Sequence, residues 1–444
     1  MQKAISLIIA GCLSAGGLVG AAQGADLLAV YRDAITYDAQ FASARAALDA
    51  GREKLPQGKS GLLPTVGLSA NSSWNEVDTT RRLSGATATN TQYNNNGWTL
   101  SLSQPLFRWQ NWVAYTQAEL AVAQAEAQFG LAKQELIVRA AQAYFDVLLA
   151  QDALATAQTQ KAAIAEQLES AKRNFEVGTA TITDSHEAQA RYDLTSAQEI
   201  AALNDLTVKQ QALRAVIGKE PEGLKRLKPG VQLIGPQPDD INKWVELAET
   251  QSASVRIYSA LFEIATREIE KQRAGHYPTL DLVASRGRSS ASNSTTLGTG
   301  YDSDSSAIGL QLSIPIFSGG VTVSKDREAV ALKEKAAAEL ENARRTAALN
   351  ARQAYLGVSS GLAQVKAYEA ALTSSQSALD SNKLGYEVGV RINIDVLNAQ
   401  SQLYDTPQKL AKARLDTLGA LLKLKAAAGS LGEDDVAAIN ALLE

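Results

Sequence analysis

The feature that most constrains the fold is a long internal repeat, because the second half of the chain echoes the first at a constant distance. Tyr144 and Tyr355, for example, lie 211 positions apart within the same Gln-Ala-Tyr triplet. Solenoid repeats have periods of about 20–50 residues, so this spacing is too long for one of them. We therefore expect two copies of one large structural unit. The matched sets are Gln142-Ala143-Tyr144 with Gln353-Ala354-Tyr355, Glu176-Val177-Gly178 with Glu387-Val388-Gly389, Asp184 with Asp395, Ala188-Gln189 with Ala399-Gln400, and Gly218 with Gly429.

Each copy contains one very long segment of helical character. Residues 111–176 and 321–387 contain no proline, and apolar side chains recur there at intervals of three and four among Gln, Glu and Lys. A helix of roughly sixty-five residues spans about 100 Å, which is too long for burial inside one globular domain. Such a helix must lie against similar helices, and the alanine-rich faces predict close, coiled-coil-like packing.

Each long segment ends at a predicted reversal of the chain. Gly178 and Gly389 follow the last helical turns, and glycine readily adopts the left-handed conformation that ends a helix. Asp184 and Asp395 come six residues later and suit the N-cap of a returning helix. Each copy is therefore expected to form one long helical hairpin.

Four short stretches alternate between apolar and small polar residues with the period of a β-strand. One apolar face and one small polar face are typical of a transmembrane β-barrel. The same alternation also suits half-buried strands of a soluble sheet. The connections 76–97 and 289–306 are rich in Asn, Ser, Thr and Gly, as extracellular barrel loops are, and they favour the barrel. The predicted strands are residues 64–74, 98–106, 278–284 and 308–316.

Four strands are too few to close a barrel, because about eight are the practical minimum. An open sheet in lipid would leave unpaired backbone groups at its edges, at a high cost in free energy. The barrel must therefore be shared between copies of the chain. Two copies would give eight strands and three would give twelve, and an open tube needs the larger number.

The N-terminus is predicted to be a targeting segment. Lys3 precedes an apolar stretch, and Ala22-Gln23-Gly24 resembles a small-x-small cleavage site. Residues 1–24 are therefore expected to be a signal peptide that directs export. The single cysteine, Cys12, follows Ile9-Ala10-Gly11 and offers an alternative, since this resembles a bacterial lipoprotein box with Cys12 as the lipidated residue.

Composition argues against two other classes of protein. The net charge of -4 provides no basic surface, so nucleic acid is not an expected partner. The two histidines, His186 and His276, are far apart, and cleavage after residue 24 would leave no cysteine for a metal site. Neither a nucleophile elbow nor a phosphate-binding glycine loop occurs. We expect no enzyme activity, no cofactor and no metal.

The chain resembles the TolC-like outer-membrane channel-tunnels of Gram-negative export systems. The resemblance covers nearly the whole mature chain in order. It implies a homotrimer with a twelve-stranded barrel in outer-membrane lipid, continued by an α-helical tunnel across the periplasm. The motifs that carry it are Leu63-Pro64-Thr65, Ser103-Gln104-Pro105-Leu106-Phe107, Ala143-Tyr144-Phe145-Asp146-Val147-Leu148, residues 175–184, Gly275-His276-Tyr277-Pro278-Thr279-Leu280-Asp281-Leu282, and residues 386–398.

The same resemblance implies a gate where the hairpins end. The residues at the positions of Thr183, Asp184, Tyr386 and Arg391 form links in that family that keep the tunnel closed. The two copies differ here, because Tyr386 and Arg391 stand where the first copy has Phe175 and Ala180. The second copy is therefore the one expected to move. Asp184 is the expected acceptor in the first copy, since arginine and a carboxylate form directional, bidentate contacts.

The resemblance also places Asp395 in the constriction of the pore. The second acidic ring of the family falls on Asn398, which is a departure and predicts weaker attraction of cations. Plain structural roles remain open for these residues. Asp184 and Asp395 can be helix N-caps, with Glu187 completing a capping box at Asp184, and Arg391 can be a solvated turn residue.

The resemblance implies passive transport rather than chemistry. A periplasmic adaptor protein and an inner-membrane transporter would dock on the inner end of the tunnel and pass small molecules or proteins through it. We expect a signal peptide (1–24), a first repeat (25–218), an equatorial linker (219–239), a second repeat (240–429) and a C-terminal equatorial segment (430–444). The alternative is a periplasmic coiled-coil adaptor or structural protein, which would share the hairpins but have no use for lipid-compatible strands.

Overall fold

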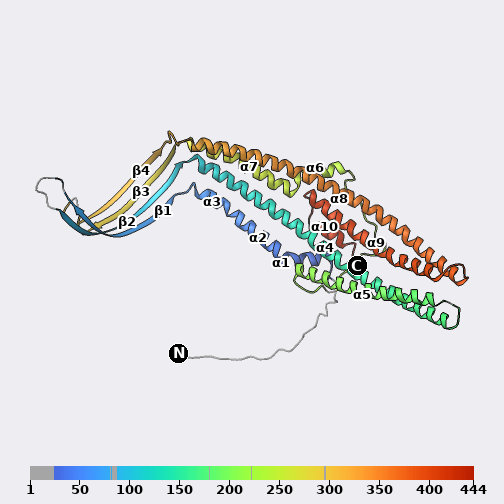
Figure 1. Cartoon of the computed structure of the whole chain (residues 1–444). Coiled ribbons are helices and arrows are strands. Elements are labelled where there is room, and N and C mark those ends of the chain that lie inside the picture. The colour runs from blue at the N-terminus through green and yellow to red at the C-terminus, as the bar shows by residue number, and fades with distance from the viewer. Residues whose placement is uncertain (1–24, 81, 83–87, 180, 222, 295–296) are drawn as a thin grey trace, which may run out of the picture.

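The computed structural model describes residues 25–444 apart from 81, 83–87, 180, 222 and 295–296. The predicted signal segment with Cys12, and Ala180 in the first reversal, lie outside the described residues. The described chain is an elongated body with a four-stranded sheet at one end and long helical hairpins at the other (Figure 1). None of its described helices is both long and apolar enough to cross a membrane.

The order of elements follows the predicted repeat. Three shorter helices, two strands and a long hairpin form the first half, and a similar set forms the second half. The first half contains α1 (Leu27–Tyr37), α2 (Ala39–Arg52), α3 (Lys54–Ser60), β1 (Thr65–Thr79), β2 (Thr89–Phe107), α4 (Trp109–Glu176) and α5 (Ile182–Ile217). The second contains α6 (Ile241–Gln251), α7 (Ala253–Arg273), the 3₁₀ turn η1 (Ala274–His276), β3 (Thr279–Ala291), β4 (Tyr301–Ser313), α8 (Val321–Glu387), α9 (Asn393–Ala427) and α10 (Glu433–Asn440).

The two long hairpins confirm the prediction of paired helices. α4 has 68 residues and α8 has 67, and each packs along its returning helix, α5 or α9. The hairpins lie side by side, with their reversals at the end of the molecule opposite the sheet (Figure 1). α9 also contains Pro407, which has no counterpart in α5, where Ser196 stands at that point of the repeat.

The sheet joins the two repeats. Its order is β1-β2-β3-β4, and all three pairings are antiparallel. The central pairing, β2 with β3, therefore connects strands from different halves of the chain. β1 and β4 have no second partner within the described chain, so the sheet has two open edges.

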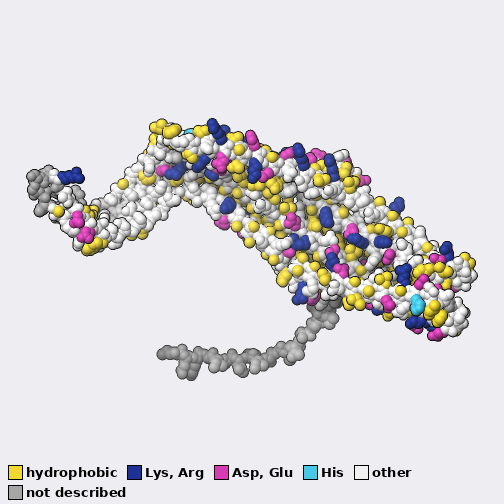
Figure 2. Space-filling model, viewed as in Figure 1, with side chains coloured by type: hydrophobic (Ala, Val, Ile, Leu, Met, Phe, Trp, Pro, Cys, Tyr) yellow, Lys and Arg dark blue, Asp and Glu magenta, His cyan; other side chains and the backbone are white. Residues whose placement is uncertain are grey.

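One face of the sheet is apolar and the other carries small polar side chains. Val66 pairs with Leu102, Leu102 with Ala284, and Ala284 with Ile308, which makes an apolar row across all four strands. On the other face, Ser101 lies beside Gly67 and Ser285. Charged side chains cover the helical part of the molecule and are sparse on the strands between the junction and their far ends (Figure 2).

The strands are longer than predicted, and much of the predicted loops is sheet. β1 reaches Thr79, β2 begins at Thr89, and β3 and β4 extend to Ala291 and from Tyr301. The prediction was wrong because it followed side-chain alternation, whereas backbone pairing continues after the alternation ends. Polar side chains also bond across these outer segments, as Asn90 does with Glu76 and Asp78 at 3.0 and 2.6 Å.

The helical region before the first strand is divided into three helices, α1, α2 and α3. Asp38 interrupts it because its carboxylate caps α2, accepting from the backbone N–H of Phe41 at 2.7 Å. The same carboxylate accepts from Arg139 of α4 at 2.8 Å, so the break is fixed to the long hairpin.

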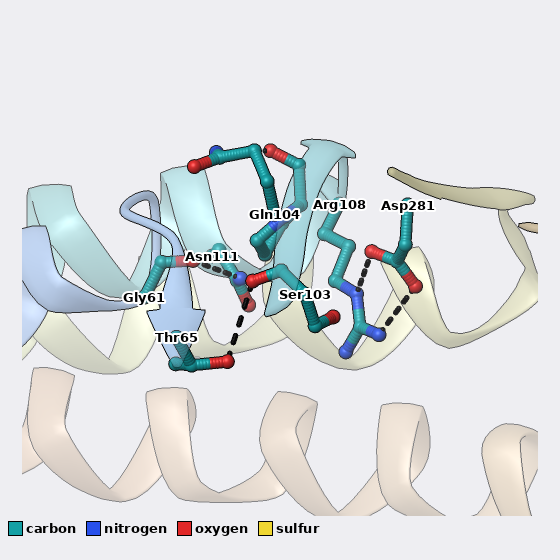
Figure 3. Close-up of polar contacts among 8 residues, drawn as sticks. Gly61, Thr65, Ser103, Gln104, Arg108, Asn111 and Asp281 are labelled. Atoms are coloured by element: carbon teal, nitrogen blue, oxygen red, sulfur yellow. Dashed lines mark hydrogen bonds and ion pairs between the residues drawn. The ribbon is translucent and has the colours of Figure 1, made fainter. Parts of the chain in front are cut away.

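The corner between sheet and helices is held by a bidentate ion pair. Arg108 lies between β2 and α4, and its Nε and Nη2 donate to the two carboxylate oxygens of Asp281 in β3 at 2.8 and 2.6 Å (Figure 3). Asn111 donates to the carbonyl of Gly61, and Thr65 donates to the carbonyl of Ser103 at 3.3 Å. These bonds fix the angle at which α4 leaves the sheet.

The largest core lies midway along the hairpins. It joins α1, α4, α5, α9 and α10, and both chain-terminal regions of the described structure meet there. The backbones of Arg226 and Glu444 exchange hydrogen bonds of 3.1 and 2.9 Å, and Asp26 accepts from Asn440 at 3.1 Å. The linker and the C-terminal segment thus pack together midway along the molecule.

Candidate functional site

The two reversals at the hairpin ends have the same geometry. Gly178 and Gly389 both adopt the predicted left-handed conformation, with φ of 78° and 75°. The N–H of each glycine bonds to a carbonyl in the last helical turn, that of Phe175 at 3.0 Å and that of Tyr386 at 3.1 Å. Glycine is required here because a side chain strains this backbone conformation. Both glycines are open to solvent, with nothing within 4 Å of an added Cβ.

The start of α5 differs in one respect from the prediction. Thr181, not Asp184, is the N-cap, and Asp184 is the third residue of the helix. The Asp184 carboxylate accepts from the N–H and hydroxyl of Thr181 at 3.0 and 2.8 Å, and Thr181 accepts from the N–H of Asp184. These bonds make a capping box from Thr181 and Asp184, so Glu187 is not part of it. The expected N-cap role of Asp184 is therefore wrong by three residues.

The start of α9 departs from the prediction in the same way. Ile392 is the N-cap and provides no side-chain bond, and Asp395 is the third residue of the helix. The Asp395 carboxylate instead lies 3.6 Å from the guanidinium of Arg391. A carboxylate in the first turn is also favourable because it faces the positive end of the helix dipole.

Within one chain, the structure does not bring Arg391 to Asp184. The aliphatic part of Arg391 lies against Gly385, and its guanidinium pairs with Asp395 of the same hairpin. Thr183 is exposed, and Tyr386 is more than a third exposed. All four predicted gate residues thus lie at the ends of the long hairpins.

Asn398 has a partner that sequence reasoning missed. Its side-chain carbonyl accepts from Nη2 of Arg191 at 2.7 Å, and this bond joins α5 of the first hairpin to α9 of the second. The two residues lie 207 positions apart, so no local pattern indicates the contact. Among the described residues, no other side-chain hydrogen bond or ion pair joins one long hairpin to the other.

Sequence reasoning also missed that the repeated tyrosines contact the linker between the repeats. Tyr144 is fully buried, and its hydroxyl donates to the carbonyl of Lys225 at 2.7 Å. Burial raises the pKa of Tyr144 well above its ordinary value, and the nearby Asp26 carboxylate adds to the effect. Tyr355 donates to Asp239 at 2.6 Å, which raises the pKa of Tyr355. The equivalent tyrosine of each repeat therefore holds one end of the linker between the repeats.

The part of the chain that the structure describes contains no group of three or more His, Cys, Asp or Glu side chains arranged to hold a metal ion. The candidate site consists of the two hairpin tips and the hydrogen bonds and ion pairs of their side chains. Such an arrangement can hold neighbouring helices together or release them.

Comparison with known proteins gives consistent results along the chain. The sequence model of the outer membrane efflux protein family matches residues 30–219 and 244–430, which correspond closely to the two repeats. Outer membrane protein TolC of Vibrio cholerae serotype O1 is 33% identical over 445 residues, covering 100% of this chain and 99% of that protein. Alkaline protease secretion protein AprF of Pseudomonas aeruginosa is 34% identical over 420 residues, covering 94% of this chain and 86% of AprF.

Solved structures show the same fold. The outer membrane protein VceC of Vibrio cholerae superimposes with a TM-score of 0.75 at 20% identity, covering 91% of this chain and 96% of VceC.

Proposed function

This chain belongs to the outer membrane efflux protein family, and from that premise we propose that it works as a homotrimer. The protein is an exit duct in the outer membrane of a Gram-negative bacterium. The open edges of the sheet support the trimer, because β1 and β4 need partners that another copy of the chain can provide. Three copies give a twelve-stranded barrel with the apolar row facing lipid and the small polar face lining water.

The main support for this proposal is the direct connection between the strands and the long helices. Each long helix begins within a few residues of a barrel strand, α4 directly after β2 and α8 shortly after β4. One chain therefore provides both a segment of the membrane barrel and a segment of a tunnel beyond it. This continuity and the family match favour the duct over the coiled-coil adaptor considered above, which would not require the strands.

We assign each part of the chain to one part of this duct. Residues 25–218 and 240–429 would each contribute two strands and one hairpin, and 219–239 and 430–444 would belong to the equatorial band. The bonds from Tyr144 and Tyr355 to the linker, and the pairing of Arg226 with Glu444, support this division.

The hairpin tips would form the gate. Thr183, Asp184, Tyr386 and Arg391 are placed to link neighbouring hairpins, and Asp395 would line the constriction. Support comes from their common location at the end of the wall and from the matching turns at Gly178 and Gly389. The pairing of Arg391 with Asp184 is proposed between adjacent copies, since within one chain Arg391 pairs with Asp395.

Energy and choice of substrate would come from partners. The family resemblance implies a periplasmic adaptor and an inner-membrane transporter as partners, and we propose both for this chain. AprF and PrtF are named for protease secretion, so proteins are one class of cargo to test, alongside small molecules. The relatives are transport channels, and we propose no catalytic activity for this one.

Two experiments test the duct. Fractionation should recover the protein with the outer membrane, extractable only by detergent as a heat-modifiable trimer. Purified protein should then open water-filled channels in planar bilayers. Recovery in the soluble periplasm, or bilayers that stay silent, would refute the proposal.

A further inference from the structure

We propose that Arg191 is a positioning and selectivity residue of the duct. Through its bond to Asn398, it ties the first hairpin to the second and places a positive charge near the inner constriction. The inference rests on the proposed function, because it assigns a residue to the gate of that duct. It concerns a contact within one chain, whereas the four predicted gate residues are assigned to contacts between chains.

The backbones on both sides of this bond are firmly anchored. On α5, Ala188 and Thr195 flank Arg191 and are buried, and Ala188 packs against Leu168 of α4. On α9, Leu397 next to Asn398 is buried. The two side chains therefore extend from separate, well-packed hairpins, and their bond reports the distance between those hairpins.

The apolar contact between the hairpins in the main core lies toward the middle of the molecule. There α4 packs on α9 through Leu148, Leu415 and Leu418 in the main core. Between that core and the hairpin tips, ion pairs lie inside single hairpins. Lys161 pairs with Glu199 in the first hairpin, and Arg414 pairs with Glu369 in the second. The Arg191–Asn398 bond is thus placed where the hairpins can separate while the core stays intact.

The second hairpin is more polar inside than the first at this level. Ser375 of α8 is buried against Thr406 of α9, with their hydroxyls 3.3 Å apart, whereas the repeat places the buried Ile164 at the position of Ser375. Pro407 follows Thr406 and removes one backbone bond from α9. A helix that bends here would move Asn398 away from Arg191.

The chemistry of the pair determines the local charge. The acceptor of Arg191 is a neutral amide, and no described carboxylate lies within salt-bridge distance of its guanidinium. Asp395, one turn before Asn398, lies 3.6 Å from Arg391 and forms no ion pair with Arg191 in the described chain. Three copies in a trimer would therefore place three guanidinium charges near the constriction, where a second acidic ring would place three carboxylates. This arrangement should disfavour cations.

The test uses single channels of the full-length protein in planar bilayers. We expect Arg191→Gln to raise conductance or open probability by about two- to tenfold, the effect of losing one modest hydrogen bond per chain. Asn398→Ala should give the same increase. The double variant should match either single one, because both changes remove the same bond. Additive effects would refute the tie.

A second readout separates charge from position. Arg191→Lys keeps the charge but loses the planar donor geometry, so it should raise conductance while leaving the reversal potential in a KCl gradient unchanged. Arg191→Gln should shift that potential toward cations. Asn398→Asp alone should alter block by Mg²⁺ little, because Arg191 neutralises the new carboxylate, whereas Asn398→Asp with Arg191→Gln should strengthen the block.

Arg173→Gln is the matched control, since Arg173 lies near the same tip and, among the described residues, bonds only within its own helix. The trimer yield of each variant is measured first, to exclude misfolding. If the wild-type protein forms channels but Arg191→Gln behaves like Arg173→Gln in both readouts, the proposed role of Arg191 is refuted. The proposed duct would not be affected by that result. Wild-type protein that forms no channel would refute the proposed function and this inference with it.

Discussion

The ion pair at the corner between sheet and helices should be worth measurable stability. Arg108 and Asp281 meet through two short bonds, and the Asp281 side chain is only 8% exposed. Replacing Arg108 with alanine would leave that carboxylate without its cation. Removing one partner of a fully buried pair typically costs about 3–5 kcal/mol.

The expected loss here is smaller, because the Arg108 side chain is 42% exposed and water can partly replace it. We expect Arg108→Ala to lower the free energy of unfolding by about 2 kcal/mol per chain, close to the contribution of charged hydrogen bonds. Arg108→Lys keeps the charge without the bidentate geometry, so its loss should be smaller. Replacing both Arg108 and Asp281 with alanine should cost less than Arg108→Ala alone, because no carboxylate is left unpaired.

The assay is urea-induced unfolding of protein refolded into lipid vesicles, with stability taken from the midpoint at constant slope. The control is Arg273→Ala, which breaks an ion pair to Asp326 of 2.9 Å with both side chains more exposed. That change should cost less than about 1 kcal/mol. Equal losses in Arg108→Ala and Arg273→Ala would show that burial of Asp281 does not strengthen the corner.

Three further predictions concern the gate, the equatorial band and the long helices. Tyr386→Phe with Arg391→Ser should raise single-channel conductance and sensitise cells to large antibiotics, and unchanged conductance would make Arg391 an ordinary turn residue. Tyr144→Phe leaves the Lys225 carbonyl without its donor and should cost about 1–2 kcal/mol in urea unfolding; no loss would mean that another donor replaces the hydroxyl. Gly130→Ala, with nothing near the added methyl group, should gain about 0.5–1 kcal/mol, whereas Gly361→Ala would push against Thr417 of α9 and should lose about 1–3 kcal/mol; the opposite order would refute the packing of α8 on α9.

The long hairpins could be predicted from sequence because their signals are local and occur twice. The absence of proline and the spacing of apolar residues predicted the second long helix at residues 321–387, and α8 has those bounds. The glycine after each helix fixed the reversal, since only a left-handed residue continues the chain there.

Other features could not be predicted correctly, for identifiable reasons. A Thr three positions before Asp184 matches a capping-box pattern, so the true N-cap was readable but was overlooked in favour of the repeated aspartate. The outer parts of the strands lack alternation, and only backbone pairing reveals them. The Arg191–Asn398 bond depends on how two separately folded hairpins lie together, which no pattern along the chain encodes. The roles assigned to the gate residues remain predictions.

The central seam of the sheet has a consequence for how the protein must be made. β2 and β3 come from different repeats, and the residues that fasten their junction, Arg108 and Asp281, are 173 positions apart. A nascent chain that has been synthesised only as far as α5 contains β1 and β2 but not β3 and β4. An isolated two-stranded hairpin of this kind is marginally stable at best in water. Pairing across such a distance is slow, because loop-closure entropy opposes it. We therefore expect the first strands to remain unassembled until β3 and β4 have been synthesised and exported, which would make insertion into the membrane a late, cooperative step.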